Sequence, residues 1–223
     1  MSRSEPADAR KRTSTVMRLL GLPDAFSQDT FTNLLGIEKG IAKVYLSRWT
    51  AAGHLQSSGP RTAFYFNVLK NRSAPSEFMA EAIRHVYPTA LVRGVTVLHA
   101  AGVTTQVPHQ VDVAVLAPAN RARTNGFNEV PKPRSWYVAV HQMKAKEGMF
   151  GLPALQPEMA LADLYATKGD WHPDIDDLEV DELDWKRFKK ACDVLGIEVP
   201  PQLQELVARS CAADGQARRR RTP

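Results

Sequence analysis

Apolar residues in the first part of the chain recur at spacings of three and four, which is typical of amphipathic helices. The pattern predicts a helix within residues 8–21, a short one between Ser27 and Gly36, and a third from Glu38 to Gly53. Ser27 is a favourable N-cap because its hydroxyl can accept a hydrogen bond from the first helical turn. Gly36 is a favourable C-cap because glycine adopts the left-handed conformation without steric cost.

The third predicted helix has an apolar and a polar side. Ala42, Leu46 and Trp49 follow one another at spacings of four and three, so they form one stripe for a core to cover. The opposite side carries the residues that we expect to face the groove of a DNA duplex: Lys39, Lys43, Ser47 and Arg48.

After the third helix the hydrophobic period changes from helical to strand spacing. The chain turns at "SSGPR", residues 57–61, and continues as "TAFYF", residues 62–66, which is rich in strand-forming residues. Three helices and a hairpin are the layout of a winged helix-turn-helix, whose third helix enters the major groove. We therefore predict such a DNA-binding domain over residues 1–70, with Arg61 and Thr62 at the hairpin tip contacting phosphates.

The remaining chain predicts a larger mixed α+β domain over residues 71–212, with a small sheet. Helices are expected at 77–87, 92–101, 157–167, 180–196 and 200–212, and strands at 110–118, 135–143 and 147–155. Residues 213–223, "ADGQARRRRTP", contain almost no apolar side chains, so we expect a disordered basic tail. The predicted fold class is therefore α+β, with an N-terminal winged helix-turn-helix.

Charge is distributed unevenly along the 223 residues. Residues 1–72 contain 11 Lys and Arg against 5 Asp and Glu, whereas residues 73–217 contain 14 against 19. Four arginines follow at 218–221. A basic N-terminal domain favours a polyanionic partner, and the acidic remainder disfavours a protein that coats nucleic acid with its whole surface.

Composition narrows the class of protein further. No apolar run reaches the roughly 18 residues that a membrane-spanning helix needs, and the N-terminus lacks the apolar stretch of a secretory signal, so we expect a cytoplasmic protein without a membrane partner. Cys192 and Cys211 have no second pair with which to build a metal site, and we expect two reduced thiols. The six histidines show no metal-binding spacing. We expect no metal and no cofactor.

Catalytic motifs are missing as well. The sequence has no GxSxG elbow and no phosphate-binding glycine loop, which indicates that the protein is not an enzyme. The alternative is a small metal-dependent nuclease or nucleotide-modifying enzyme that uses Asp112 with carboxylates near residues 174–184. That acidic run is also what the start of a helix and a solvated face would show. A third class is a protein-interaction module in which the acidic domain binds a basic protein. This class does not explain the basic charge of the N-terminal part.

Three segments carry a resemblance to a known family. "FTNLLGIEKGIAKVYLSRWTAAGHLQSSGPRTAFYF", "ALVRGVTVLHAAGVTTQVP" and "LPALQPEMALADLYAT" resemble the AbiEi-type antitoxins of type IV toxin-antitoxin systems, from about residue 15 to about residue 196. The resemblance implies an autorepressor that binds repeats in its own promoter as double-stranded DNA. It also implies an antitoxin whose C-terminal domain counters a toxin of the nucleotidyltransferase type. The Arg-rich end departs from the family pattern.

Overall fold

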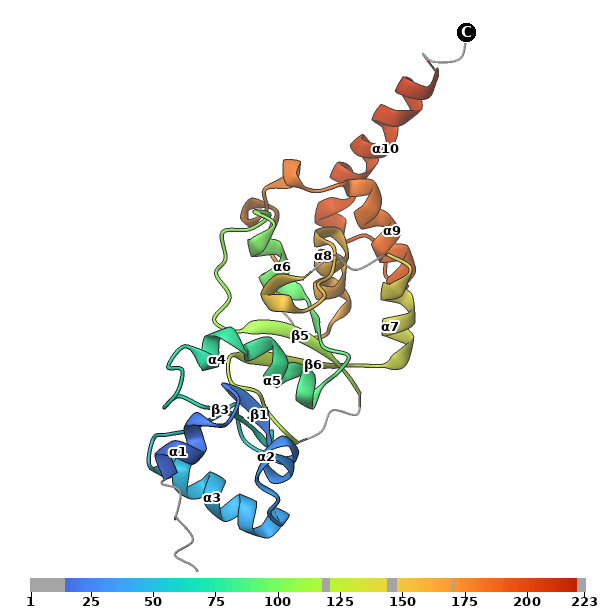
Figure 1. The fold of residues 1–223 in the computed structure, drawn as a ribbon. Helices are drawn as coiled ribbons and strands as arrows, with labels where there is room; N and C mark the ends of the chain where they lie inside the picture. The colour runs from blue at the N-terminus through green and yellow to red at the C-terminus, as the bar shows by residue number, and fades with distance from the viewer. Residues whose placement is uncertain (1–14, 118–120, 144–147, 170, 220–223) are drawn as a thin grey trace, which may run out of the picture. The chain divides into compact units, whose positions relative to one another are not determined.

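The computed structural model describes residues 15–117, 121–143, 148–169 and 171–219, with side chains up to residue 212. The chain is a mixed α+β protein that packs as two units, Met1–His85 and Val86–Pro223 (Figure 1). Among the described residues, each unit contains one three-stranded sheet.

Unit 1 alternates short helices with very short strands. Its elements are α1 (Thr15–Leu20), β1 (Ala25–Ser27), α2 (Gln28–Leu35), α3 (Lys39–Ala51), β2 (Gln56–Ser57), β3 (Phe64–Phe66), α4 (Ala74–Glu77) and α5 (Met79–Val86). The three strands form an antiparallel sheet in the order β1-β3-β2. The three predicted helices and the hairpin are present, while β1 was not expected; residues 8–14 of the first predicted helix lie outside the described residues.

The caps of α2 are those that the sequence predicts. The Ser27 hydroxyl accepts a hydrogen bond from the Thr30 amide at 3.0 Å, and Gly36 adopts φ +61° at the other end. The core of unit 1 then forms between buried residues of α1, β1, α2 and α3. Phe31 of α2 meets the edge of Trp49 at a ring-centroid distance of 5.6 Å, and Leu46 is almost fully buried.

Unit 1 extends beyond the expected boundary at residue 70. Phe64 and Phe66 of β3 pack with Ala74 and Ala82, which belong to α4 and α5, and Phe78 covers this second core. The apolar stripe of the helix after residue 73 thus completes the N-terminal unit, and the division between units falls after His85.

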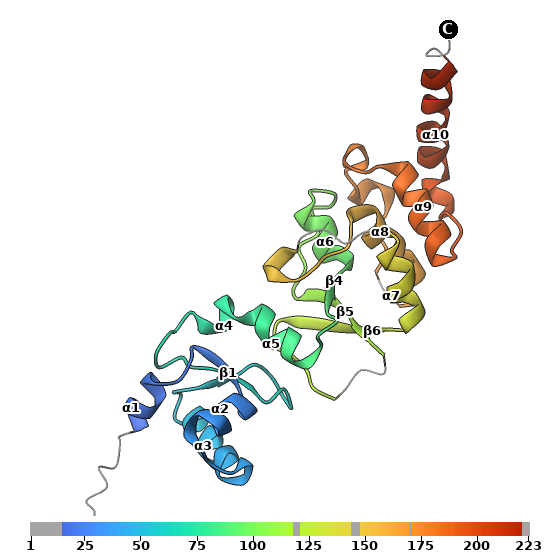
Figure 2. The ribbon, with the colours of Figure 1, turned by 45° about the vertical axis from the view of Figure 1, so that its right-hand side comes forward.

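Unit 2 is a small sheet with helices packed upon it (Figure 2). Its elements are β4 (Leu91–Val92), α6 (Gly94–Ala100), β5 (Val111–Leu116), β6 (Phe127–Lys132), α7 (Arg134–His141), η1 (Met149–Gly151), α8 (Pro157–Ala166), η2 (Ile175–Asp177), η3 (Val180–Glu182), α9 (Trp185–Leu195), η4 (Pro201–Leu203) and α10 (Gln204–Arg219). The sheet order is β4-β5-β6, with β4 antiparallel and β6 parallel to β5. Helix α8 is buried on all sides from Pro157 to Leu164.

Two predicted strands of unit 2 are wrong. Residues 135–143 form most of helix α7, in which Trp136 and Val140 are buried one turn apart while Val138 is 59% exposed. A strand would have placed all three side chains on one face. Residues 148–155 contain the 3-10 turn η1, where Phe150 has φ +55°, and only a single bridge at Ala154; residue 147 lies outside the described residues.

Strand β6 was not predicted from the sequence, and it contains Pro131, which lacks the amide for a central ladder. Since β6 lies at the edge of the sheet, proline is tolerated there. At the other end of the unit, helix α10 continues to Arg219 within the segment expected to be disordered, because alanine, glutamine and arginine are good helix formers. Residues 220–223 lie outside the described residues.

Candidate nucleic-acid interface

Helix α3 of unit 1 presents a polar surface opposite its buried stripe. Ala42, Leu46 and Trp49 are 0%, 1% and 6% exposed, so their side of the helix faces the core. Lys43, Ser47 and Arg48 are all exposed on the other side. The amphipathic pattern that drives the folding of this helix therefore also fixes which side chains a ligand would meet.

The cations on α3 differ in their partners. Lys39 forms an ion pair with Asp29 of α2 at 2.9 Å, and both side chains are about 70% exposed. Lys43 and Arg48 form no ion pair within the part of the chain that the structure describes. Two positive charges on the exposed face of α3 thus have no carboxylate partner in the described ranges, and this arrangement favours an anionic partner.

The loop between β2 and β3 is held by its own hydroxyl groups. The Ser58 hydroxyl donates to Thr62 Oγ1 at 2.8 Å, which in turn donates to the Gly59 carbonyl at 2.9 Å. Thr62 is 3% exposed, so the expectation that it contacts a phosphate is corrected: its side chain shapes the loop from inside. Arg61 is exposed, as expected of a residue at the tip.

Arg61 has an unfavourable backbone conformation. Its φ is +62° and that of Ala63 is +52°, in the left-handed region that residues with a Cβ seldom adopt. Such conformations cost roughly 1–2 kcal/mol each relative to the right-handed form. They persist only where the surroundings hold them, and they are frequent at binding sites. The hydroxyl network of the loop supplies this support.

Unit 2 contains a buried cluster of charges around Asp163 of α8. The carboxylate of Asp163 is fully buried and accepts hydrogen bonds from Arg93 Nε at 2.5 Å, Lys132 Nζ at 2.7 Å and Trp136 Nε1 at 2.7 Å. The hydroxyl of Thr167, the residue that follows α8, accepts from both cations and donates to the Asp163 carbonyl. The cluster joins β6, α7, α8 and the residue preceding α6. It therefore has a structural role, as a buried hydrogen-bond network that holds these elements together.

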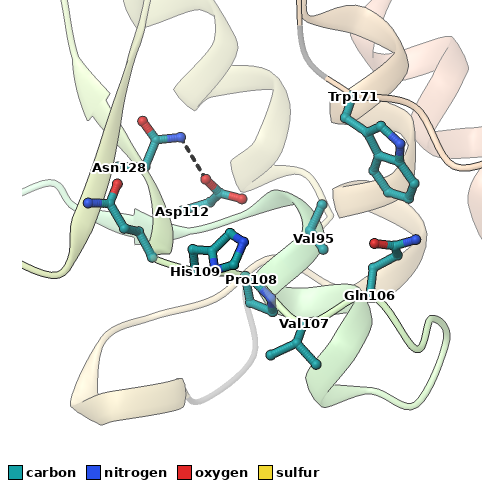
Figure 3. Close-up of a pocket in the computed structure, with 9 residues that line it drawn as sticks. Val95, Gln106, Val107, Pro108, His109, Asp112, Asn128 and Trp171 are labelled. Atoms are coloured by element: carbon teal, nitrogen blue, oxygen red, sulfur yellow. Dashed lines mark hydrogen bonds between the residues drawn. The ribbon is translucent and has the colours of Figure 1, made fainter.

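A shallow pocket of about 590 Å³ opens beside the sheet of unit 2 (Figure 3). Its lining includes Asp112, Asn128, His109, Gln106 and Trp171. Asp112 is the residue on which the enzymatic alternative depends, and the structure gives it neighbours within the fold. Its carboxylate accepts a hydrogen bond from Asn128 Nδ2 at 2.8 Å across the β5–β6 pair.

Asp112 also lies against the first residue of α6. A Cβ on Gly94 would approach Asp112 Oδ2 to 3.1 Å, and Gly94 has φ +62°, so only glycine fits this junction without strain. The Asp112 amide donates to the Thr96 hydroxyl at 3.0 Å. Asp112 therefore fastens β5 to β6 and to α6.

Several carboxylates near residues 174–184 are occupied in local turns. Asp174 and Asp177 form a capping box around η2, and Asp184 caps α9 by accepting from the Lys186 and Arg187 amides. Across the described ranges, no three His, Cys, Asp or Glu side chains come together in a way that could hold a metal ion. The sequence-based grouping of Asp112 with this run is not reproduced there.

The two cysteines are free thiols in different surroundings. Cys211 is exposed, whereas Cys192 is buried, and burial raises the pKa of its thiol to about 11. Cys192 is therefore a packing residue of α9.

Sequence reasoning found the exposed face of α3 and missed the Asp163 cluster. The face follows from a periodic pattern within one segment. The cluster joins Arg93, Lys132 and Asp163, which are far apart along the chain, and nothing local marks them as neighbours. One signal was available: Asp163 interrupts the otherwise apolar "MALADL" helix, and a charge in a buried helix requires partners.

Comparison with known proteins bears on the fold alone. No protein-family model matches the sequence, and no curated protein matches it. Among solved structures, the chain is similar to the RV2827C protein from Mycobacterium tuberculosis, with a TM-score of 0.50 and 15% sequence identity. The similarity covers 86% of this chain and 79% of that one. In the described residues, no helix is both long and apolar enough to cross a membrane.

Proposed function

We propose that the protein is a DNA-binding transcriptional regulator, with unit 1 as a winged helix-turn-helix. In this proposal α3 is the recognition helix, and the loop between β2 and β3 is the wing. The observation that carries it is that Lys43 and Arg48 are exposed, away from the buried stripe of α3, and have no carboxylate partner among the described residues. Lys39 joins them by exchanging Asp29 for a phosphate, since an exposed ion pair contributes only about 0–1 kcal/mol.

The strained conformation of Arg61 supports the same proposal. Glycine would suit φ +62° better, so the arginine at this position serves something other than the stability of the loop. A charged residue held rigidly at the tip of a hairpin is suited to contact a phosphate beside the groove that α3 enters.

The antitoxin role is proposed on the resemblance to the AbiEi-type family. In that role the protein binds repeats upstream of its own operon, and unit 2 takes part in countering a nucleotidyltransferase-like toxin. Expression of the neighbouring gene with and without this chain tests it. The role requires that the neighbouring gene inhibit growth when it is expressed alone, and that co-expression of this chain restore growth.

DNA binding is tested by mobility shift with the full chain on a fragment of its own upstream region, over a range of salt concentrations. Wild-type log K should fall linearly with log salt, with a slope of about −0.9 per phosphate contact. The double variant Lys43→Ala/Arg48→Ala should lose about 1–3 kcal/mol of binding free energy where Arg48 reads a base, and should show a shallower slope. Because both side chains are exposed, the fold should be unchanged by circular dichroism.

A matched control removes two exposed charges from unit 2. The double variant Arg187→Ala/Lys190→Ala carries the same net charge as the test variant, and both residues lie exposed on α9. It should bind as the wild type does. If the α3 variant also binds as tightly as the wild type, α3 is not the recognition helix and the proposal is rejected.

A further inference from the structure

The exposed face of α3 carries two aliphatic side chains among its cations. Ile41 and Val44 are each 48% exposed, and they stand at positions i and i+3 with Arg48 at i+7. These three residues follow one side of the exposed face, whereas Lys39, Lys43 and Ser47 follow the other at i, i+4 and i+8. The core stripe of α3 makes no use of Ile41 or Val44.

Gly40, in the first turn of the same helix, is a second unexplained choice. A Cβ added there would meet nothing within 4 Å, and its backbone is not in the left-handed region. Glycine inside a helix is less stable than alanine by roughly 0.5–1 kcal/mol, so the fold itself gains nothing from it. It lies one turn before Val44. A missing side chain on an exposed helical face clears room for a partner that comes close to the backbone.

Resting on the proposed DNA-binding role, we propose that Ile41 and Val44 contact the C5 methyl groups of thymine in the major groove. Gly40 lets the first turn of α3 approach the bases. The major groove displays the thymine methyl as its apolar feature, and the N-terminal part of a recognition helix is the part that reaches base edges. The bound site therefore contains thymine where α3 lies, beside the position that Arg48 contacts.

A protein partner fits this face less well. Lysine is depleted in the core of protein interfaces, and Lys43 stands next to Val44 in the sequence. Two half-exposed aliphatic residues are also a small part of the roughly 800 Å² per partner that a stable interface buries. Charge complementarity with a duplex accounts for the cations and the aliphatic pair together.

The test uses duplexes selected from a random-sequence library by the full chain, in which each thymine is replaced in turn by deoxyuridine. Removing a contacted methyl should weaken wild-type binding about fourfold at one or more positions. Val44→Ala should weaken binding to the thymine duplex. Its binding should then be unchanged when the thymine that Val44 contacts is replaced by deoxyuridine. Ile41→Ala should behave in the same way at a neighbouring position, and Lys190→Ala should retain the full wild-type sensitivity.

Gly40→Ala adds a readout that a purely structural role would not produce. It should raise the urea midpoint of unfolding while weakening binding to the selected duplex. Unchanged or tighter binding would remove Gly40 from the inference.

The outcomes separate the two proposals. If the chain binds no duplex, or if Lys43→Ala/Arg48→Ala binds as the wild type does, the DNA-binding role fails and this inference fails with it. If binding is intact and every deoxyuridine replacement is neutral, or the selected sites lack thymine, only the thymine contact is overturned. The same holds if Val44→Ala changes the sedimentation of the free protein and leaves DNA binding alone, which would assign Ile41 and Val44 to an interface between copies.

Discussion

One lysine–aspartate ion pair of unit 1 and one of unit 2 have similar lengths and opposite surroundings. Lys39 and Asp29 of unit 1 are 2.9 Å apart with side chains 72% and 68% exposed. Lys132 and Asp163 of unit 2 are 2.7 Å apart with side chains 7% and 0% exposed. Water screens the first pair, so either side chain can replace its partner by another ion at a small cost in free energy. The second pair is desolvated, so each charge depends on the other.

The contrast extends to the helices that carry these charges. Helix α3 buries aliphatic and aromatic residues and turns its cations outward, which leaves them available to a ligand. Helix α8 is buried all round and turns Asp163 inward, where three donors surround it. Charge thus supports the fold in the interior of unit 2, whereas the cations of α3 face solvent. The candidate binding surface is the helical face whose cations Lys43 and Arg48 form no ion pair among the described residues.

The largest expected effect is that of Asp163→Asn. The variant leaves the buried cations Arg93 and Lys132 with one carboxylate fewer, and breaking a buried pair in this way costs about 3–5 kcal/mol. Unit 2 should therefore unfold at a much lower urea concentration. Amide hydrogen exchange should rise in α8 and β6 and stay unchanged in α2 and α3.

The matched control for that variant is Asp193→Asn, which removes an exposed pair with Lys189 on α9 at the same O···N distance as the pair in unit 1. It should change the free energy of unfolding by less than about 1 kcal/mol. Equal losses in the free energy of unfolding for both variants would mean that burial does not distinguish these pairs, and would contradict the comparison.

Arg61→Gly has an intermediate effect and separates stability from binding within unit 1. Glycine relieves the positive φ and adds freedom to the unfolded chain, so the net gain in the free energy of unfolding should be about 0.5–1 kcal/mol. DNA binding should weaken at the same time, with a salt slope shallower by about 0.9. Thermal unfolding and mobility shift measure the two quantities.

Arg61→Ala is the control, because it removes the same charge and keeps the strain. It should weaken DNA binding as much as Arg61→Gly without the gain in stability. A less stable Arg61→Gly protein would show that the arginine side chain supports the loop, contrary to its placement as an exposed contact residue.

The elements that the sequence predicted well are those whose signals are local. Helix α2 has both its caps within nine residues of each other, and α3 has an apolar stripe closed by Trp49. Such patterns need no information from the rest of the chain. The exposed cations of α3 follow from the same stripe, which is why the candidate interface was recognisable before the structure.

Some of the features that were missed depend on distant parts of the chain, and others on contacts within one loop. Val138 and its neighbours have strand propensity, yet α7 forms because Trp136 reaches Asp163 and Val140 is buried beside it. Thr62 was expected to be a polar residue at the hairpin tip, but its hydroxyl points into the loop and accepts a hydrogen bond from Ser58. The backbone angle of Arg61 has no sequence signal, since arginine rarely adopts it. Tertiary packing overrides local preference in α7, whereas hydrogen bonds within the loop orient the Thr62 side chain.

The smallest expected effect belongs to Asp29→Asn, which releases Lys39 from the exposed pair. The free energy of unfolding should change by no more than about 1 kcal/mol, including the loss of a favourable carboxylate in the first turn of α2. DNA binding should become tighter, because Lys39 no longer exchanges one anion for another and a repelling charge is gone. The salt slope should steepen by up to about 0.9 if Lys39 was held back in the wild type.

The same substitution in a Lys39→Ala background isolates that exchange. There, Asp29→Asn can act only by removing repulsion, so its effect on binding should be smaller and its effect on the slope should vanish. Weaker DNA binding by Asp29→Asn alone would have the opposite meaning, namely that the carboxylate positions Lys39 for its phosphate. The exposed pair would then have a defined role, as the buried pair does.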